Sequence, residues 1–166
     1  MRAIFHADRD WGIGKNNGLM FSLPKDMKFF RETTKGKVVV MGLNTLKSFP
    51  NGKPLKNRVN IVLSPDEVNE DVINVHSLDE LFEEVKKYPA DDVFVIGGAS
   101  VYRALIPYCT EVLVTKVNAC GGADLFVPNL DRDENFRLVF EGGEEEDNGY
   151  QIRFCTYRNI SPKEVL

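Results

Sequence analysis

A single carboxylate near the start of a predicted helix is the first candidate for chemistry. Asp26 follows Pro24, which suits the first position of a helix, and it shares one helical face with Phe29 and Phe30. An acidic side chain in a first turn often serves only the helix dipole, which is typically worth ~0.3–1 kcal/mol. The alternative is a carboxylate at the mouth of an apolar pocket, able to pair with the amidine-like edge of a heterocycle. The spacing alone favours the helix-dipole interpretation.

Two junctions rich in glycine form the second candidate. Gly97-Gly98 ends the apolar run 93–96, and Gly42 ends a second run, three residues before Thr45. Glycine at such a junction lets backbone N–H groups approach a phosphate at the positive end of a helix. Neither junction matches the dinucleotide fingerprint or the P-loop. Both interpretations therefore stay open, an ordinary tight turn or a cradle for the two ends of an extended dinucleotide.

The long segment 8–23 separates the first predicted strand from the first predicted helix. A connection of this length is usually functional or disordered. Several apolar side chains argue against disorder here, namely Trp11, Ile13, Leu19, Met20 and Phe21. We therefore expect a lid that closes over a ligand.

The elements that must position these residues follow from the apolar periodicity. Short β-branched runs predict strands over residues 3–7, 37–41, 58–63, 72–75, 92–96, 111–117, 136–141 and 150–157. Helices are predicted over 24–34 and 77–87, the second opened by the capping box Ser77-Leu78-Asp79-Glu80. The polar stretch 142–149 is predicted to be a simple connection between the last two strands.

The order of these elements predicts the fold class. Continuous apolar runs such as 38–40 and 93–96 are typical of strands covered on both faces. A chain of 166 residues with 43% apolar content fits one domain. We predict a single α/β domain over residues 1–166, with a central mostly parallel sheet, helices on both faces and an antiparallel C-terminal strand pair. Ligands in such folds bind at the carboxyl ends of the strands.

Composition excludes several classes of partner and site. The 21 basic and 25 acidic residues are interspersed and give a net charge of -4, so no nucleic-acid partner is expected. No apolar run is long enough for a signal peptide or a membrane span, and we expect a cytoplasmic monomer with no membrane partner. Three widely spaced cysteines are expected to be free thiols, and the two histidines stand at no ligand spacing, so no metal site is predicted.

Taken together, these segments resemble dihydrofolate reductase, a family that passes a hydride from a reduced nicotinamide cofactor to a pterin ring. The match keeps the family's order and spacing from about Ala3 to Tyr157. The residues that carry it are Ile13-Gly14, Asn17-Gly18, Leu23-Pro24-Lys25-Asp26, Phe29-Phe30, Val40-Met41-Gly42, Thr45, Lys53-Pro54-Leu55 with Arg58, Val95-Ile96-Gly97-Gly98, Tyr102 and Thr115. The resemblance implies NADPH as cofactor and reduction of 7,8-dihydrofolate to 5,6,7,8-tetrahydrofolate.

The resemblance also implies roles for substrate-binding residues. Asp26 matches the carboxylate that grips the pterin, with Thr115 as its hydrogen-bonded support. Its charge would favour the protonated pterin, while water admitted by the lid supplies the proton. Arg58 matches the arginine that clamps the carboxylate of the substrate's glutamate tail. The positions that would line the folate pocket are Ile4, Met27, Phe30, Phe49 and Ile96.

For the cofactor, the resemblance implies a second set of residues. His6 and Ile13 match positions whose backbone groups hold the nicotinamide carboxamide, so that their side chains need no chemical role. Gly97-Gly98 resembles the family's glycine pair, joined by a cis peptide bond. The other matched positions are Asn17, Gly18, Leu19, Gly42, Thr45, Ser64 and Tyr102, while Asp124 resembles a loop aspartate near the lid.

Some positions depart from the family's pattern. Met20-Phe21 stands where many relatives have Pro-Trp, and Leu43-Asn44 and Ser100 stand where many have basic residues against cofactor phosphates. Two rivals are a reductase of the riboflavin pathway, similar in fold and cofactor, and a nucleotide-binding module without catalysis. Arg58 after Lys53-Pro54-Leu55 and Asp26 after Leu23-Pro24 favour folate over the riboflavin-pathway substrate.

Overall fold

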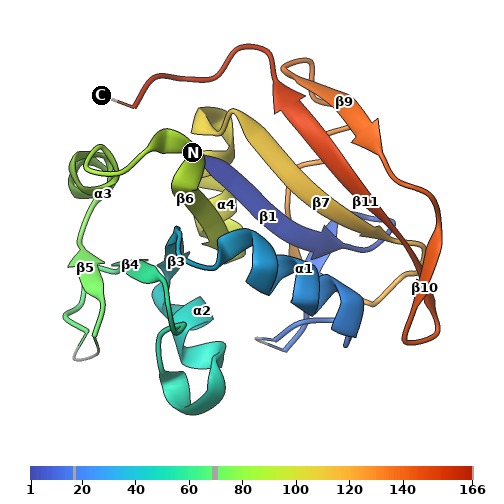
Figure 1. Cartoon of the computed structure of the whole chain (residues 1–166), viewed down its shortest axis with the longest axis horizontal. Coiled ribbons are helices and arrows are strands. Elements are labelled where there is room, and N and C mark those ends of the chain that lie inside the picture. The colour runs from blue at the N-terminus through green and yellow to red at the C-terminus, as the bar shows by residue number, and fades with distance from the viewer. Residues whose placement is uncertain (17, 69–70, 166) are drawn as a thin grey trace.

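A central sheet organises the computed structural model, which describes residues 1–16, 18–68 and 71–165. Within them the sheet has nine strands in the order β10-β11-β7-β1-β6-β3-β4-β5, and β9 also pairs with β11 (Figure 1). Strands β5, β4, β3, β6, β1 and β7 run parallel, whereas β11 is antiparallel to β7. The bounds are β1 Arg2–Ala7, β3 Val38–Gly42, β4 Val59–Leu63, β5 Ile73–Val75, β6 Val93–Gly97, β7 Glu111–Val117, β9 Phe136–Glu141, β10 Glu145–Asp147 and β11 Tyr150–Asn159.

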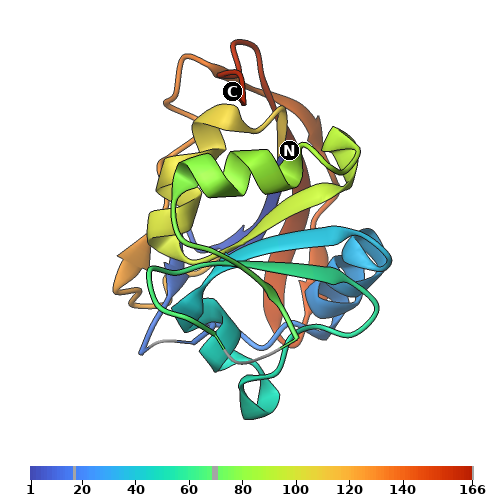
Figure 2. The ribbon, with the colours of Figure 1, turned by 90° about the vertical axis from the view of Figure 1, so that its left-hand side faces the viewer.

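Helices cover both faces of this sheet. They are α1 Pro24–Thr34, α2 Leu43–Ser48, α3 Leu78–Val85 and α4 Ala99–Leu105, with short 3-10 turns at Pro50–Gly52, Ala90–Asp92 and Ile106–Tyr108. In Figure 1, α1 lies in front of the sheet and α4 behind it, and the turned view in Figure 2 places α1 and α3 on opposite sides. The predicted α/β fold with a mostly parallel sheet is therefore confirmed.

Alternation along β3 shows how the two layers are built. Val38 and Val40 join the core formed with α3 and α4, whereas Val39 and Met41 pack with Leu46 of α2 on the opposite face. All four side chains are almost completely buried. Burial on both faces is why this strand is apolar at every position instead of at every second one.

Two predictions about connections were wrong. The stretch 142–149 contains β10, which pairs with β11 through a hairpin at Asn148-Gly149, both in the left-handed region (φ 52° and 86°). Asn-Gly is a strong hairpin signal, but the acidic residues before it are typical of a polar loop, and the strand was therefore not predicted. The segment 8–23 is likewise not all loop, since it contains β2 (Gly12–Gly14), which pairs with β8 (Leu125–Phe126).

The helix starts use two different caps. Ser77 accepts a hydrogen bond from the Glu80 N–H at 3.2 Å, as the capping-box motif predicts, although α3 ends at Val85 and not at Lys87. At α1 the cap comes from far along the chain. The buried Asp147 carboxylate accepts from the N–H groups of Lys25 and Asp26, each at 3.2 Å. This contact ties the first turn of α1, and with it Asp26, to the C-terminal hairpin.

Candidate active site

Asp26 lies in the first turn of α1 and is held through both carboxylate oxygens. The Thr115 hydroxyl donates to Oδ1 at 2.6 Å, and Nδ1 of His6 lies 3.2 Å from Oδ2. Thr115 and His6 are partners in the parallel register of β7 and β1, so they approach the carboxylate from adjacent strands. The Asp26 side chain keeps 14% of its surface exposed, so a ligand can still reach it. This arrangement offers a fixed anion to an N–H edge.

The surroundings of the carboxylate are mainly apolar and aromatic. The His6 ring faces the buried Phe21 ring with centroids 6.0 Å apart, and Phe21 in turn packs on Tyr150 at 4.8 Å. Phe21 thus fills a position beside the pair formed by Asp26 and His6. A carboxylate beside apolar rings interacts strongly with a cationic or N–H ligand because little water screens it.

The apolar positions expected to line a substrate pocket differ in exposure. Ile4 is buried in β1, and Phe49 and Ile96 are half-buried and pack against the core formed by Val39, Met41, Leu46 and Val62. Phe30 is half-buried on α1, one turn after Asp26, whereas Met27 is 49% exposed. Exposed apolar side chains next to a carboxylate are available to cover a ligand.

The two glycine junctions, far apart in sequence, lie side by side. Strands β3 and β6 are neighbours, and Met41 is paired with Gly97. The Gly97-Gly98 peptide bond is cis, and Gly97 has φ 144°. A Cβ placed on Gly97 would lie 2.8 Å from Thr45 Oγ1, and one on Gly42 would lie 3.2 Å from Val101. A side chain at Gly97 would collide with Thr45, and one at Gly42 would press on Val101, so glycine suits both positions.

Arg58 lies beside the C-terminal end of α1. Its Nη1 donates to the Thr34 hydroxyl at 3.0 Å, and its Nε donates to the Lys56 carbonyl at 3.0 Å. Burial, and next the charge of Arg31, lower the pKa of the Arg58 guanidinium. The Arg31 guanidinium is thus close enough to Arg58 to act on its charge, although only Arg58 was predicted for this part of the site. Arg31 belongs to no sequence motif and lies in the last turn of α1, three residues before Thr34.

The segment before α1 is anchored at its base and exposed at its tip. The buried Asp8 carboxylate accepts from the N–H groups of Asp10, Gly12 and Gly121 at 2.8–3.0 Å. Asp124 accepts from the Asn16 N–H at 3.0 Å. Ile13 is half-buried, Gly18 is exposed and bridges to Lys15, and Leu19 is 67% exposed. Asn17 lies outside the described residues.

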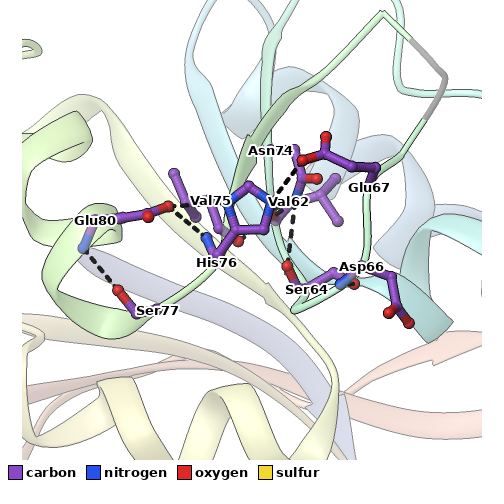
Figure 3. A network of polar contacts seen from close by, with 9 residues as sticks. All are labelled: Val62, Ser64, Asp66, Glu67, Asn74, Val75, His76, Ser77 and Glu80. Carbon is purple, nitrogen blue, oxygen red and sulfur yellow. Dashed lines mark hydrogen bonds and ion pairs between the residues drawn. The ribbon is translucent and has the colours of Figure 1, made fainter.

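Ser64 and Tyr102 are buried, and their polar groups contact backbone. Ser64 Oγ accepts from the Asp66 N–H at 3.2 Å, in the network shown in Figure 3. The Tyr102 hydroxyl donates to the Ile4 carbonyl at 2.8 Å. Burial raises the pKa of this phenol, which therefore stays neutral. Tyr102 thus braces β1, on which Ile4 and His6 lie.

His76, close to Ser64, is bound between two carboxylates. Its Nδ1 lies 3.1 Å from Glu80 and its Nε2 lies 3.1 Å from Glu67 (Figure 3). The hydrogen bond with Glu80, and next that with Glu67, raise the pKa of this imidazole. His76 is therefore paired with two acidic side chains.

The fold is an α/β domain with a mostly parallel central sheet, and in its candidate site Gly42 and Gly97 end the neighbouring strands β3 and β6. The matching family model is described as dihydrofolate reductase and covers residues 1–159. The chain therefore belongs to the dihydrofolate reductase family, whose members are oxidoreductases. This membership does not favour the riboflavin-pathway reductase or the non-catalytic module.

Relatives and a solved structure agree with the family model. Dihydrofolate reductase of Bacillus subtilis (strain 168) is 35% identical over 158 residues, which is 93% of this chain and 91% of the relative. Dihydrofolate reductase of Enterococcus faecium is 33% identical over 165 residues and 96% of each chain. A structure of dihydrofolate reductase from Enterococcus faecalis, complexed with NADP(H) and RAB-propyl, matches with a TM-score of 0.83 at 34% identity over 95% of each chain.

Two negative findings apply to the described part of the chain. Its His, Cys, Asp and Glu side chains form no group of three or more that could hold a metal ion. None of its helices is long and apolar enough to cross a membrane.

Proposed function

We propose that this chain reduces 7,8-dihydrofolate to 5,6,7,8-tetrahydrofolate with NADPH and that Asp26 is its catalytic carboxylate. The observation that carries the proposal is the Asp26 carboxylate, fixed by Thr115 at 2.6 Å in a mainly apolar site. One oxygen of an ionised carboxylate can accept from the pterin amino group and the other from a ring N–H. The pairing favours a positive charge on the pterin, which helps the ring nitrogen next to the reacting carbon to become protonated.

The glycine junctions fit a bound dinucleotide. Gly97 lets the Thr45 hydroxyl lie close to the backbone, since a Cβ there would be 2.8 Å from Thr45 Oγ1, and Gly42 lies close to Val101 in the same way. These residues would hold NADPH, which supplies the hydride when bound. Backbone groups of His6 and Ile13 would orient the nicotinamide. Gly18, Leu19 and Asn17 of the lid, with Ser64 and Tyr102, complete the proposed cofactor contacts.

The remaining substrate contacts follow from the apolar surface and the arginine pair. Phe30, Met27, Phe49, Ile4 and Ile96 would enclose the folate. Arg58 would bind the carboxylate of the glutamate tail, and the nearby Arg31 adds a second positive charge. The lid excludes bulk water during hydride transfer.

The direct test is incubation of the purified chain with NADPH and dihydrofolate while the cofactor absorbance is followed. We expect absorbance to fall only when both compounds are present. A ribosylated pyrimidine of the riboflavin pathway is the matched control substrate. Turnover of that control, or of neither compound, would contradict the proposal. We further propose that residues 1–166 act as one domain and as a cytoplasmic monomer, which size-exclusion chromatography and cell fractionation would test.

A further inference from the structure

His6 is a buried titratable side chain in direct contact with the catalytic carboxylate. Its side chain is 5% exposed, and Nδ1 lies 3.2 Å from Asp26 Oδ2. Nε2 is also buried and has no hydrogen-bond partner. The role proposed above for His6 uses only its backbone, so its imidazole has no function in that account.

The contact determines where the imidazole carries its proton. An ionised carboxylate can only accept a hydrogen bond, so Nδ1 of His6 must be the donor. Thr115 donates to the other oxygen, and Asp26 is therefore held from both sides. With Nδ1 protonated, Nε2 is a bare acceptor in the neutral ring and an N–H in the cation. The two protonation states of His6 thus differ by one full charge beside Asp26.

We propose that His6 is a positioning residue for Asp26 and that its protonation weakens the carboxylate's effect on the pterin. This inference rests on the proposed function. Neutral His6 orients Asp26 and leaves its charge available to a ligand. The His6 cation forms an ion pair with Asp26 whose net charge is zero, so the protonated pterin is favoured less. The rate of hydride transfer should therefore rise less as the pH falls than it would in an enzyme that has no titratable side chain at position 6.

Other titratable groups around the pair belong to three elements. Asp147 of β10 accepts from the Asp26 N–H, and its charge adds to that of Asp26. Tyr102 of α4 senses the Asp26 charge, and burial raises its pKa, so it contributes no charge near neutral pH. Tyr150 of β11 is separated from His6 by the Phe21 ring. Histidine is the side-chain type in this set that changes charge between about pH 5 and pH 8.

The kinetic test compares His6→Asn and His6→Ala with the parent. Asparagine keeps a donor close to the Nδ1 position but does not titrate, whereas alanine removes both properties. Single-turnover hydride transfer is measured with saturating NADPH and dihydrofolate from about pH 5.5 to about pH 7.5. We expect the ratio of the acid to the neutral rate to be roughly three- to tenfold larger in His6→Asn than in the parent. We expect His6→Ala to be slower than His6→Asn at every pH.

Two kinetic results would overturn the inference. One is a set of pH profiles that superimpose after scaling, because a structural role for His6 would move the rate but not the profile's shape. The other is equal rates for His6→Asn and His6→Ala, because then the Nδ1 donor would not orient Asp26.

A second measurement does not depend on activity. Imidazole nitrogen NMR of the parent should show His6 protonated at Nδ1 and bare at Nε2 in its neutral form. Asp26→Asn should shift the His6 imidazole signals while leaving those of His76, an internal reference in the same spectrum, unchanged. A His6 tautomer protonated at Nε2, or signals indifferent to Asp26→Asn, would overturn the inference. If dihydrofolate is not reduced, the proposed function fails, and this spectrum still decides whether the pair exists.

Discussion

Replacing Asp26 by asparagine separates the charge of the carboxylate from its shape. The amide is nearly isosteric, but it has one acceptor oxygen where Thr115 and His6 now donate to two, at 2.6 and 3.2 Å. The Thr115 hydroxyl can rotate to accept from the amide while His6 donates to the amide oxygen, so at most one hydrogen bond is lost, about 1 kcal/mol of folding free energy. The loss of the negative charge, by contrast, should slow hydride transfer. Acid–base assistance is commonly worth ~10²–10⁴-fold, or roughly 3–5 kcal/mol of barrier.

The assay is single-turnover hydride transfer at neutral pH, alongside thermal unfolding of the same preparations. We expect Asp26→Asn to remain folded and to lose most of the rate. The matched control is Asp92→Asn, because Asp92 directly precedes β6, at the amino end of the strand, where it pairs with Lys37 at 3.0 Å. This control should keep the parental rate. A rate for Asp26→Asn within about threefold of the parent, less than 1 kcal/mol of barrier, would refute the assignment of Asp26.

Three further predictions concern the tail, the cofactor and stability. Arg58→Lys should weaken dihydrofolate binding far more than binding of a pterin without the glutamate tail, because lysine cannot make the paired contact; equal losses in the two dissociation constants would remove Arg58 from this role. Leu43→Arg should raise the ratio of kcat/KM for NADPH to that for NADH by about one to two powers of ten, since the parent has no charge at this position, and an unchanged ratio would show that the 2′-phosphate lies elsewhere. Because the folded-state pKa of His76 is raised, first by Glu80 and then by Glu67, its stabilising effect is complete below the unfolded-state pKa and is lost as pH rises through the folded-state pKa. The Tm difference between the parent and His76→Asn should accordingly shrink with rising pH, and a difference that grows would contradict this sign.

The local elements of the fold were largely predictable from the sequence. Runs such as 38–41 and 93–96 are apolar at every position, which predicts central strands, and Ser77 with Glu80 predicts the start of α3. Each of these signals comes from residues that are close together in the sequence. They predict the observed elements correctly because the tertiary contacts favour the same local structure.

Sequence reasoning failed for two short elements that are recognisable as strands only from their pairing with another strand. Strand β2 pairs with β8 more than one hundred residues away, and β10 is too short and acidic to be recognised without β11. Both elements pair through backbone hydrogen bonds, which leave little trace in side-chain type.

The sequence by itself determined the family resemblance, the fold class and the identity of the candidate carboxylate, because the order and spacing of the motifs are properties of the chain. Tertiary structure decided the surroundings of that carboxylate. Thr115 is 89 residues from Asp26 and His6 is 20 residues away, and the register of β1 with β7 brings both to it. The fold likewise brings Arg31 close to Arg58 and Glu67 close to His76. Charges act through space over a few ångströms, and the fold alone decides which charges are that close.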